Sequence, residues 1–287
     1  MLKQLVKSFW IGLRRRWWGG LSNAFGAVGA IWTLTELTIG SFPAAKTFLE
    51  THGTDYIWLM VSVSMPVFVG YVFETRSVSF KLPTTDTRIT LKYADLFAQD
   101  ANILIGVNEF FDGALGQAVS PSSLHGQFIA RNYQGSEAAF RLDVDAALVN
   151  APNTATVRTN GPTHSYPIGT TAVLRTGARR TFLVAMAKTD VLTLKASSTV
   201  PLLWDALRAG LLSVHNNGGG EPLALPLIGN AQASINIEPQ HLLRLITLAL
   251  VDFGRSTQLP KQVAIVLHNS CFEQLDIREI ARDWKRR

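Results

Sequence analysis

Hydrophobic and polar positions divide this chain into an apolar, helix-patterned first quarter and a longer remainder of short apolar runs and amphipathic segments. From Leu2 to Leu13 the apolar residues follow each other at intervals of three or four, which is typical of one helix face. Lys3 and Lys7 lie off that face. Residues 1–20 are therefore predicted to form a basic amphipathic helix on a membrane surface, with an ordinary surface helix as the alternative.

Two apolar stretches follow, and each is long enough to cross a membrane. Residues 21–42 contain one charged residue, Glu36, and as a helix they would span about 33 Å. Residues 57–73 contain no charge. A signal peptide is the competing interpretation, but the first run is too long for one and a second run follows at once. We predict a transmembrane hairpin over residues 21–73.

The charges that flank the hairpin predict its orientation. Arg14, Arg15 and Arg16 precede the first stretch, and Arg76 follows the second. Positive residues stay on the cytoplasmic side, so both termini are expected there, with the protein in the cell inner membrane as a two-helix multi-pass protein.

Small residues recur at every fourth position in both apolar stretches, a spacing that lets helices approach closely in lipid. Glu36 is costly in hydrocarbon, so it should face a partner helix or water, or lie near the outer surface. We therefore expect a homo-oligomer, for which a tetramer is one arrangement, in contact with membrane lipid, with a plain membrane anchor as the alternative. The two stripes are Ser22/Gly26/Ala30 and Ser62/Pro66/Gly70.

From Ser77 onward the pattern changes to one of alternating strands and helices, which indicates an α/β sandwich over residues 77–287. The strands are short apolar or alternating runs, and the helices are amphipathic. The expected strands are 78–82, 88–92, 103–107, 171–175, 181–187, 223–228 and 263–267. The expected helices start near Leu124 and cover 136–149, 201–214, 239–253 and 272–284.

The segment from Asn102 to Gln127 carries the clearest candidate site. A buried strand ends at Asn108, a polar loop follows, and a helix begins after the serines at 120–123. The free N–H groups and the dipole of a helix N-terminus favour an anion, although an ordinary strand–loop–helix crossover is the alternative. A second loop of small residues begins at Gly229, after the strand 223–228, and ligands bind at such strand ends.

Composition excludes several classes of protein. The net charge of +6 is concentrated at the N-terminus, since the first 35 residues contain no acid, so nucleic-acid binding is not expected. The single cysteine, Cys271, excludes an intrachain disulfide framework and leaves no structural zinc site. No bound metal or cofactor is expected.

The residues from Ser77 to the C-terminus resemble the macro domain, an ADP-ribose-binding α/β/α fold. Ala94-Asp95-Leu96 is similar to the family's Gly-Asp-Ile, whose Asp binds the adenine amino group, and Gly106-Val107-Asn108 resembles the end of its Asn-Ala-Ala-Asn motif, whose last Asn contacts the distal ribose. Residues 166–172 resemble the Cys-Pro-x-Gly-x-Ala turn, and residues 226–231 occupy the place of the second phosphate loop. The resemblance implies ligand contacts from Asp95, Leu96, Asn108, Ser122, Ser123, Leu124, His125, Gly126, Gln127, Gly229, Asn230, Ala231, Gln232 and Ala233.

The chain also departs from the macro-domain pattern. Ser120-Pro121-Ser122-Ser123-Leu124-His125-Gly126 replaces the glycine-rich first loop, and His125 stands about where hydrolytic macro domains often place an Asp. This favours a sensor without catalytic residues over a membrane-tethered ADP-ribosyl hydrolase. His125 itself is either a ligand contact or a helix-surface histidine.

Two membrane helices before a divergent macro domain resemble the membrane effectors of type II Thoeris anti-phage defence. The resemblance implies that a TIR-domain partner enzyme makes an ADP-ribose-type signal, a histidine–ADP-ribose conjugate. The macro domain would sense this signal, and the membrane helices would then disrupt the membrane. A docking module for ADP-ribosylated partners is a further alternative.

Overall fold

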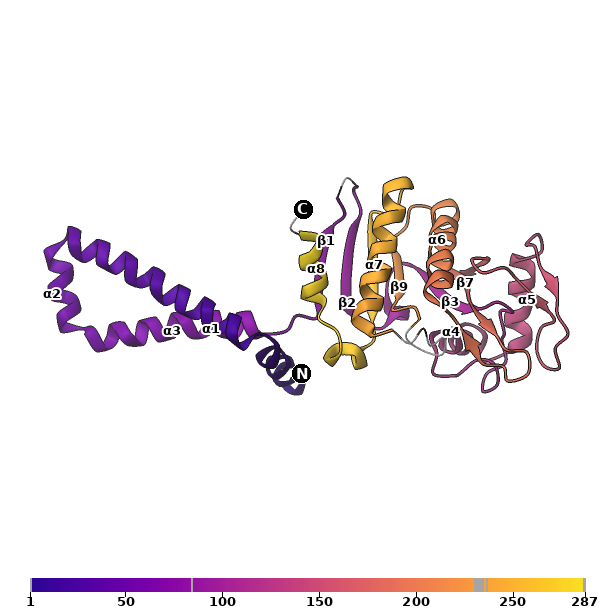
Figure 1. The fold of residues 1–287 in the computed structure, drawn as a ribbon, viewed down its shortest axis with the longest axis horizontal. Helices are drawn as coiled ribbons and strands as arrows, with labels where there is room; N and C mark the ends of the chain where they lie inside the picture. The colour runs from indigo at the N-terminus through magenta and orange to yellow at the C-terminus, as the bar shows by residue number, and fades with distance from the viewer. Residues whose placement is uncertain (1, 84, 230–234, 236, 286–287) are drawn as a thin grey trace. The chain divides into compact units, whose positions relative to one another are not determined.

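The chain divides into two compact units, residues 1–76 and residues 77–287, in a computed structural model (Figure 1). The structure describes residues 2–83, 85–229, 235 and 237–285. The predicted phosphate-loop residues Asn230, Ala231, Gln232 and Ala233 lie outside this described part.

Residues 2–76 of the first unit form three helices. They are α1 (Leu2–Ser41), α2 (Pro43–Thr51) and α3 (Gly53–Val72). The sequence predicts separate helices before and after residue 20, whereas α1 runs through that point as one helix. It kinks at Arg16, whose φ of −137° and ψ of 17° are not helical. The expected link between the apolar stretches is also helical, because Pro43 at its first turn has a φ suited to a helix start.

Among the helices that the structure describes, α3 is the one whose length and apolar composition would suffice to cross a membrane. The apolar residues of α1 are interrupted by Ser, Thr, Asn and Gly. The membrane-spanning role of residues 21–42 therefore stays a prediction.

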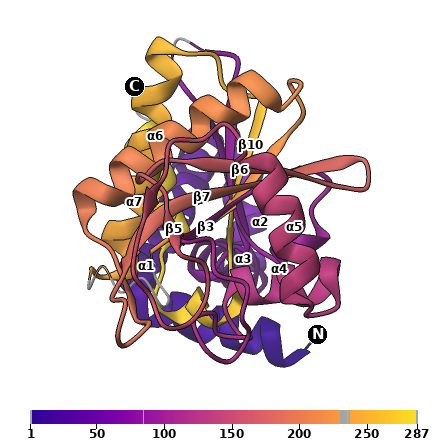
Figure 2. The ribbon, with the colours of Figure 1, turned by 90° about the vertical axis from the view of Figure 1, so that its right-hand side faces the viewer.

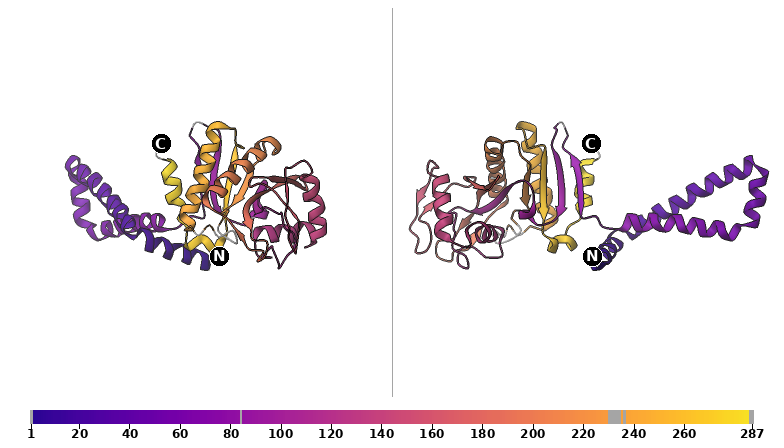
Figure 3. Two further views of the ribbon diagram at one scale, coloured as in Figure 1. Left: turned by 45° about the vertical axis from the view of Figure 1, so that its right-hand side comes forward. Right: turned by 180° about the vertical axis from the view of Figure 1, so that it is seen from behind.

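Glycines bring α1 against the end of α3. A Cβ on Gly12 would lie 1.6 Å from the Val72 carbonyl oxygen, and one on Gly19 would lie 2.7 Å from the Tyr71 ring. Closer to α2 the two helices diverge (Figure 3), and the Thr35 and Tyr56 hydroxyls are hydrogen-bonded there. Close approach within one chain thus depends on glycines outside the predicted small-residue stripes.

A carboxylate is buried at the end of α3. Glu74 is 3% exposed and lies 3.2 Å from the guanidinium of Arg16 and 3.5 Å from that of Arg15. The Ser8 hydroxyl donates to the Glu74 carbonyl oxygen at 2.5 Å. These contacts hold the first turns of α1 to the residues that follow α3.

The second unit is built on a mixed sheet with the strand order β1-β2-β10-β9-β3-β7-β6. Its central pairs, from β2 to β7, are parallel, and the hairpins β1–β2 and β6–β7 are antiparallel. A short strand, β8, pairs with β7, and β4 pairs with β5 outside this sheet. The strands are β1 (Ser77–Lys81), β2 (Arg88–Tyr93), β3 (Asn102–Asn108), β4 (Thr154–Ala155), β5 (His164–Ser165), β6 (Thr171–Thr176), β7 (Arg179–Thr189), β8 (Ala196–Ser197), β9 (Leu223–Pro226) and β10 (Gln262–Leu267).

Helices cover both faces of this sheet, as the sequence predicts for an α/β sandwich (Figure 2). On one face α6 packs so closely that a Cβ on Gly210 would lie 2.9 Å from the Leu104 side chain. On the other face Phe128 and Phe140 of α4 and α5 join a buried core with Ile105. The helices are α4 (Leu124–Tyr133), α5 (Glu137–Ala147), α6 (Val200–Asn217), α7 (Pro239–Ser256) and α8 (Ile277–Lys285), with 3-10 turns η1 (Leu96–Ala98) and η2 (Asn269–Glu273).

The prediction of one continuous helix over residues 272–284 is wrong. The chain forms η2, breaks at residues 274–276, and only then begins α8. Asp276 accepts hydrogen bonds from the backbone N–H groups of Arg278 and Glu279, so it caps the later helix start. A capping side chain inside an apolar pattern explains why the pattern alone placed the start too early.

Candidate functional site

Parallel strands bring the predicted loops together at one edge of the sheet. Asn108 ends β3, and residues 227–229 follow β9, which is the parallel neighbour of β3. On the other side of β3, Met186 and Ala187 lie near the carboxyl end of β7. The carboxyl ends of β9, β3 and β7 therefore lie side by side, at the position where α/β sheets bind ligands.

A cavity of about 110 Å³ lies at this edge. Its polar side chains, among the described lining residues, are those of Asn108, Ser123 and His125. The lining residues are Ile105, Gly106, Val107, Asn108, Ala118, Val119, Ser123, Leu124, His125, Met186, Ala187, Ala196, Pro226, Leu227, Ile228 and Gly229.

The N-terminus of α4 forms one wall of the cavity. Ser123 is the N-cap, and its hydroxyl accepts a hydrogen bond from the Gly126 N–H at 3.0 Å. A Cβ on Gly126 would lie 2.2 Å from the Ser120 carbonyl oxygen, so only glycine fits this close turn. The first N–H groups of α4 have no earlier carbonyl within the helix, which makes this wall favourable for an anion.

His125 is buried in this wall and is not the helix-surface histidine that one interpretation of the sequence allowed. It is 7% exposed, and its ring centroid lies 5.4 Å from that of Phe140. Within the described part of the chain, its Nε2 has no hydrogen-bond partner. Burial lowers the pKa of His125 to about 3, so the imidazole is neutral near pH 7.

Two glycines shape the floor and rim of the cavity. A Cβ on Gly106 would lie 1.9 Å from the Met186 sulfur, so the Met186 side chain occupies the space that any larger residue would need. Gly229 has a φ of +94°, and a Cβ there would lie 2.7 Å from Ile235. Both positions explain why small residues mark these two strand ends in the sequence.

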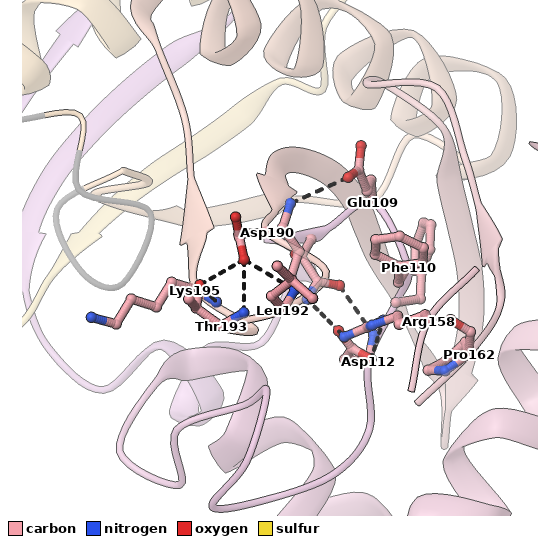
Figure 4. A network of polar contacts seen from close by, with 12 residues as sticks. Glu109, Phe110, Asp112, Arg158, Pro162, Asp190, Leu192, Thr193 and Lys195 are labelled. Atoms are coloured by element: carbon pink, nitrogen blue, oxygen red, sulfur yellow. Dashed lines mark hydrogen bonds and ion pairs between the residues drawn. The ribbon is translucent and has the colours of Figure 1, made fainter. Parts of the chain in front are cut away.

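The turn between β7 and β8 completes the rim. Asp190 accepts hydrogen bonds from the N–H groups of Leu192 and Thr193 and from the Thr193 hydroxyl (Figure 4). Those from Thr193 are the main reason why the pKa of Asp190 lies below its ordinary value. This turn places Ala196 in the lining. Met186, Ala187 and Ala196 are not among the predicted ligand contacts, although Met186 and Ala187 lie on the parallel neighbour of β3.

The structure does not bring all predicted contacts to the cavity. Asp95 lies outside the lining, where it accepts from the Phe97 N–H at 3.0 Å and pairs with Arg131. Leu96 is part of the core. Ser122, Gly126 and Gln127 stabilise the turn before α4, with the Gln127 amide donating to the Ser122 carbonyl oxygen at 3.1 Å. Asn108, Ser123, Leu124, His125 and Gly229 are the predicted residues that line the cavity.

Comparison with known families agrees with this architecture. The family model described as "Thoeris protein ThsA, Macro domain" matches residues 89–268. The chain belongs to this family. The match begins in β2 and ends just after β10, so the ThsA macro domain includes every strand end that borders the cavity.

Among solved structures, the chain is similar to the macrodomain of Oceanobacillus iheyensis. A mutant of that macrodomain with ADPR is 11% identical, with a TM-score of 0.48, and the match covers 73% of this chain and 97% of that chain. The same macrodomain with ADP is 12% identical, with a TM-score of 0.47 and coverage of 73% and 95%. Among curated proteins, none matches this chain.

Proposed function

We propose that this member of the ThsA macro domain family is a sensor of an ADP-ribose derivative in anti-phage defence. The observation that carries the proposal is the cavity at the carboxyl ends of β3, β9 and β7, walled by the N-terminus of α4. A diphosphate would bind the free N–H groups of that helix and the loop that starts at Gly229. The adenine would reach Asp95, and the distal ribose would reach Asn108.

Sensing is favoured over hydrolysis by the character of His125. A hydrolase needs a positioned base to activate water. The buried imidazole, with a pKa lowered to about 3, holds protons far more weakly than a general base that works near pH 7. The proposal therefore gives the chain no catalytic residue and requires no metal or cofactor.

The first unit would be the effector. Many apolar side chains of α3 are not covered by other parts of the described chain, including those of Trp58, Leu59 and Met65. We propose that α3 and residues 21–42 both cross the inner membrane, with both termini cytoplasmic. We further propose that several copies assemble, with a tetramer as one arrangement. A TIR-domain partner enzyme would supply the signal, histidine–ADP-ribose, and binding would trigger membrane disruption.

Liposomes that carry the full chain test this function. ADP-ribose and histidine–ADP-ribose are added separately while ligand binding by calorimetry and release of a trapped dye are measured. Saturable binding with ligand-dependent leakage is expected, and the ligand should be recovered intact. Binding without leakage would instead support a docking module, and catalytic release of free ADP-ribose would support a hydrolase. Absence of binding to both ligands contradicts the proposal.

A further inference from the structure

The side chain of Asn108 is held at both ends by one residue, Asp112. The Asn108 amide nitrogen donates to Asp112 Oδ2 at 2.7 Å, and the Asn108 side-chain oxygen accepts from the Asp112 backbone N–H at 3.1 Å. These two bonds leave the carboxamide one N–H and one oxygen lone pair. A ligand hydroxyl, which both donates and accepts, is complementary to that remaining pair.

The Asp112 carboxylate is held in turn by Arg158. Two guanidinium nitrogens of Arg158 reach the two carboxylate oxygens at 2.9 and 2.8 Å, in a bidentate arrangement (Figure 4). Both side chains are buried, with exposed fractions of 0% for Arg158 and 1% for Asp112. A buried carboxylate is costly unless it is paired, so Arg158 holds the Asp112 side chain in place.

Arg158 comes from a segment that does not line the cavity. It lies between β4 and β5, 46 residues after Asp112, and its guanidinium carbon is 4.3 Å from the centre of the Phe110 ring. In the same segment, Gly161 has a φ of +85°, and a Cβ there would lie 2.7 Å from Asp112 Oδ1. The backbone of this segment therefore approaches the carboxylate as closely as a glycine allows.

We propose that Arg158 is a positioning residue for the ligand site: acting through Asp112, it fixes the direction in which the Asn108 carboxamide presents its free N–H and lone pair to a ligand hydroxyl. This inference rests on the proposed binding function. Without the guanidinium, the Asp112 carboxylate would lose the partner that holds it, and Asn108 would lose the fixed acceptor that orients its amide. Segment 156–163 would then control ligand affinity without touching the ligand.

Calorimetry with ADP-ribose on the full chain in nanodiscs tests the coupling. Arg158→Met should weaken binding roughly tenfold, and Arg158→Lys should restore part of the loss because it returns a charge. In an Asn108→Ala background, Arg158→Met should cause no further loss. If the two losses instead add, Arg158 acts independently of Asn108 and the proposal is overturned.

Two further variants separate positioning from general damage to the fold. The paired change Asp112→Asn with Arg158→Met leaves no unpaired buried charge, so it should fold, yet it should bind as weakly as Asn108→Ala. Parental affinity in this pair overturns the proposal. Arg141→Met is the matched control, because Arg141 donates to the carbonyl oxygens of Phe110 and Phe111 in the same loop. It should leave the affinity unchanged, and an equal loss there overturns the proposal as well.

A measurement on the ligand-free chain tests the positioning role of Arg158 separately from the proposed binding of ADP-ribose. The side-chain amide resonance of Asn108, assigned by its loss in Asn108→Ala, should shift in Arg158→Met and stay in place in Arg141→Met. An unmoved resonance in Arg158→Met overturns the positioning role. A shifted resonance in a parent chain that fails to bind ADP-ribose would keep the positioning role and reject ADP-ribose as the ligand.

Discussion

The Asp95 carboxylate lies 3.3 Å from the Arg131 guanidinium at the surface of the second unit. Both side chains are about half exposed, and Arg131 also lies 4.6 Å from the centre of the Phe97 ring. An exposed ion pair of this kind contributes about 0–1 kcal/mol, because water and salt screen it. A ligand amino group can therefore replace Arg131 as the partner of Asp95 at little cost.

The first prediction concerns recognition by this carboxylate. Asp95→Asn keeps an oxygen to cap η1 but removes the charge, and it should weaken ADP-ribose binding by about 1.5–3 kcal/mol, roughly ten- to a hundredfold. Arg131→Met should not weaken binding, since Arg131 competes for the same oxygen. Calorimetry on both variants makes the comparison. An unchanged affinity in Asp95→Asn would remove Asp95 from the ligand site.

The second prediction concerns acid stability. The pKa of His125 is about 3 in the folded chain against an ordinary value of 6.5, so between these limits the unfolded chain binds a proton that the folded chain does not. Stability should therefore fall as the pH drops below 6.5, by about 1.4 kcal/mol per pH unit from this residue. Thermal unfolding from pH 7 to pH 4 should show a shallower loss in His125→Phe than in the parent.

His241→Gln is the control for that measurement, because His241 is an exposed histidine on α7. Its unfolding profile should follow the parent across the whole pH range. A parental slope in His125→Phe would show that His125 is not kept neutral by burial.

The third prediction separates contacts within one hairpin from contacts between copies. A Cβ on Gly19 would lie 2.7 Å from the Tyr71 ring, whereas one on Gly26 would meet nothing within 4 Å. Gly19→Leu should therefore disturb the pairing of α1 with α3. Gly26→Leu should leave that pairing intact and abolish leakage only by blocking assembly between copies. Cross-linking in liposomes, beside the dye-release assay, measures both effects.

Gly40→Leu serves as the control, since a Cβ on Gly40 also meets nothing within 4 Å and the residue lies outside the small-residue stripe. It should assemble and permeabilise like the parent, and ligand affinity should stay unchanged in all three variants. If Gly26→Leu permeabilises liposomes as well as Gly40→Leu does, the stripe has no part in assembly.

The fourth prediction concerns the buried carboxylate of the first unit. Glu74→Gln leaves Arg15 and Arg16 facing a neutral group. The interaction that holds the first turns of α1 to the residues after α3 should therefore weaken by about 3 kcal/mol. This is the lower end of the range for a broken buried ion pair, because Arg15 is partly exposed. Trypsin should then cleave faster at residues 14–16. Glu50→Gln, an exposed change on α2, should leave cleavage at the parental rate.

Local patterns in the sequence predict most elements of the second unit, because the spacing of apolar residues shows which side chains of a strand or helix are buried. They do not predict the position of β10 between β2 and β9, since strand pairing over such a distance leaves no local periodicity. The cap at Asp276 and the kink at Arg16 were missed for a related reason. Both interrupt a pattern that otherwise continues across them.

The candidate site was predictable in part. Asn108 and the N-terminus of α4 follow from a strand end and a helix start, whereas the link between Asp112 and Arg158 joins segments 46 residues apart that share no motif. The burial of His125 did leave a signal. It stands three and four residues before Phe128 and Ile129, and that spacing puts it on the apolar face of α4.

The position of β10 also bears on when the sheet that carries the candidate site can form. Residues 262–267 fill the gap between β2 and β9, so the sheet stays divided until these residues have been synthesised. Long-range parallel pairing of this kind forms late and slowly. The apolar helices of the first unit, by contrast, leave the ribosome first. Under the proposed function, the nascent chain would insert its apolar helices into the membrane before the sheet is complete, and it would not bind its ligand until β10 is in place.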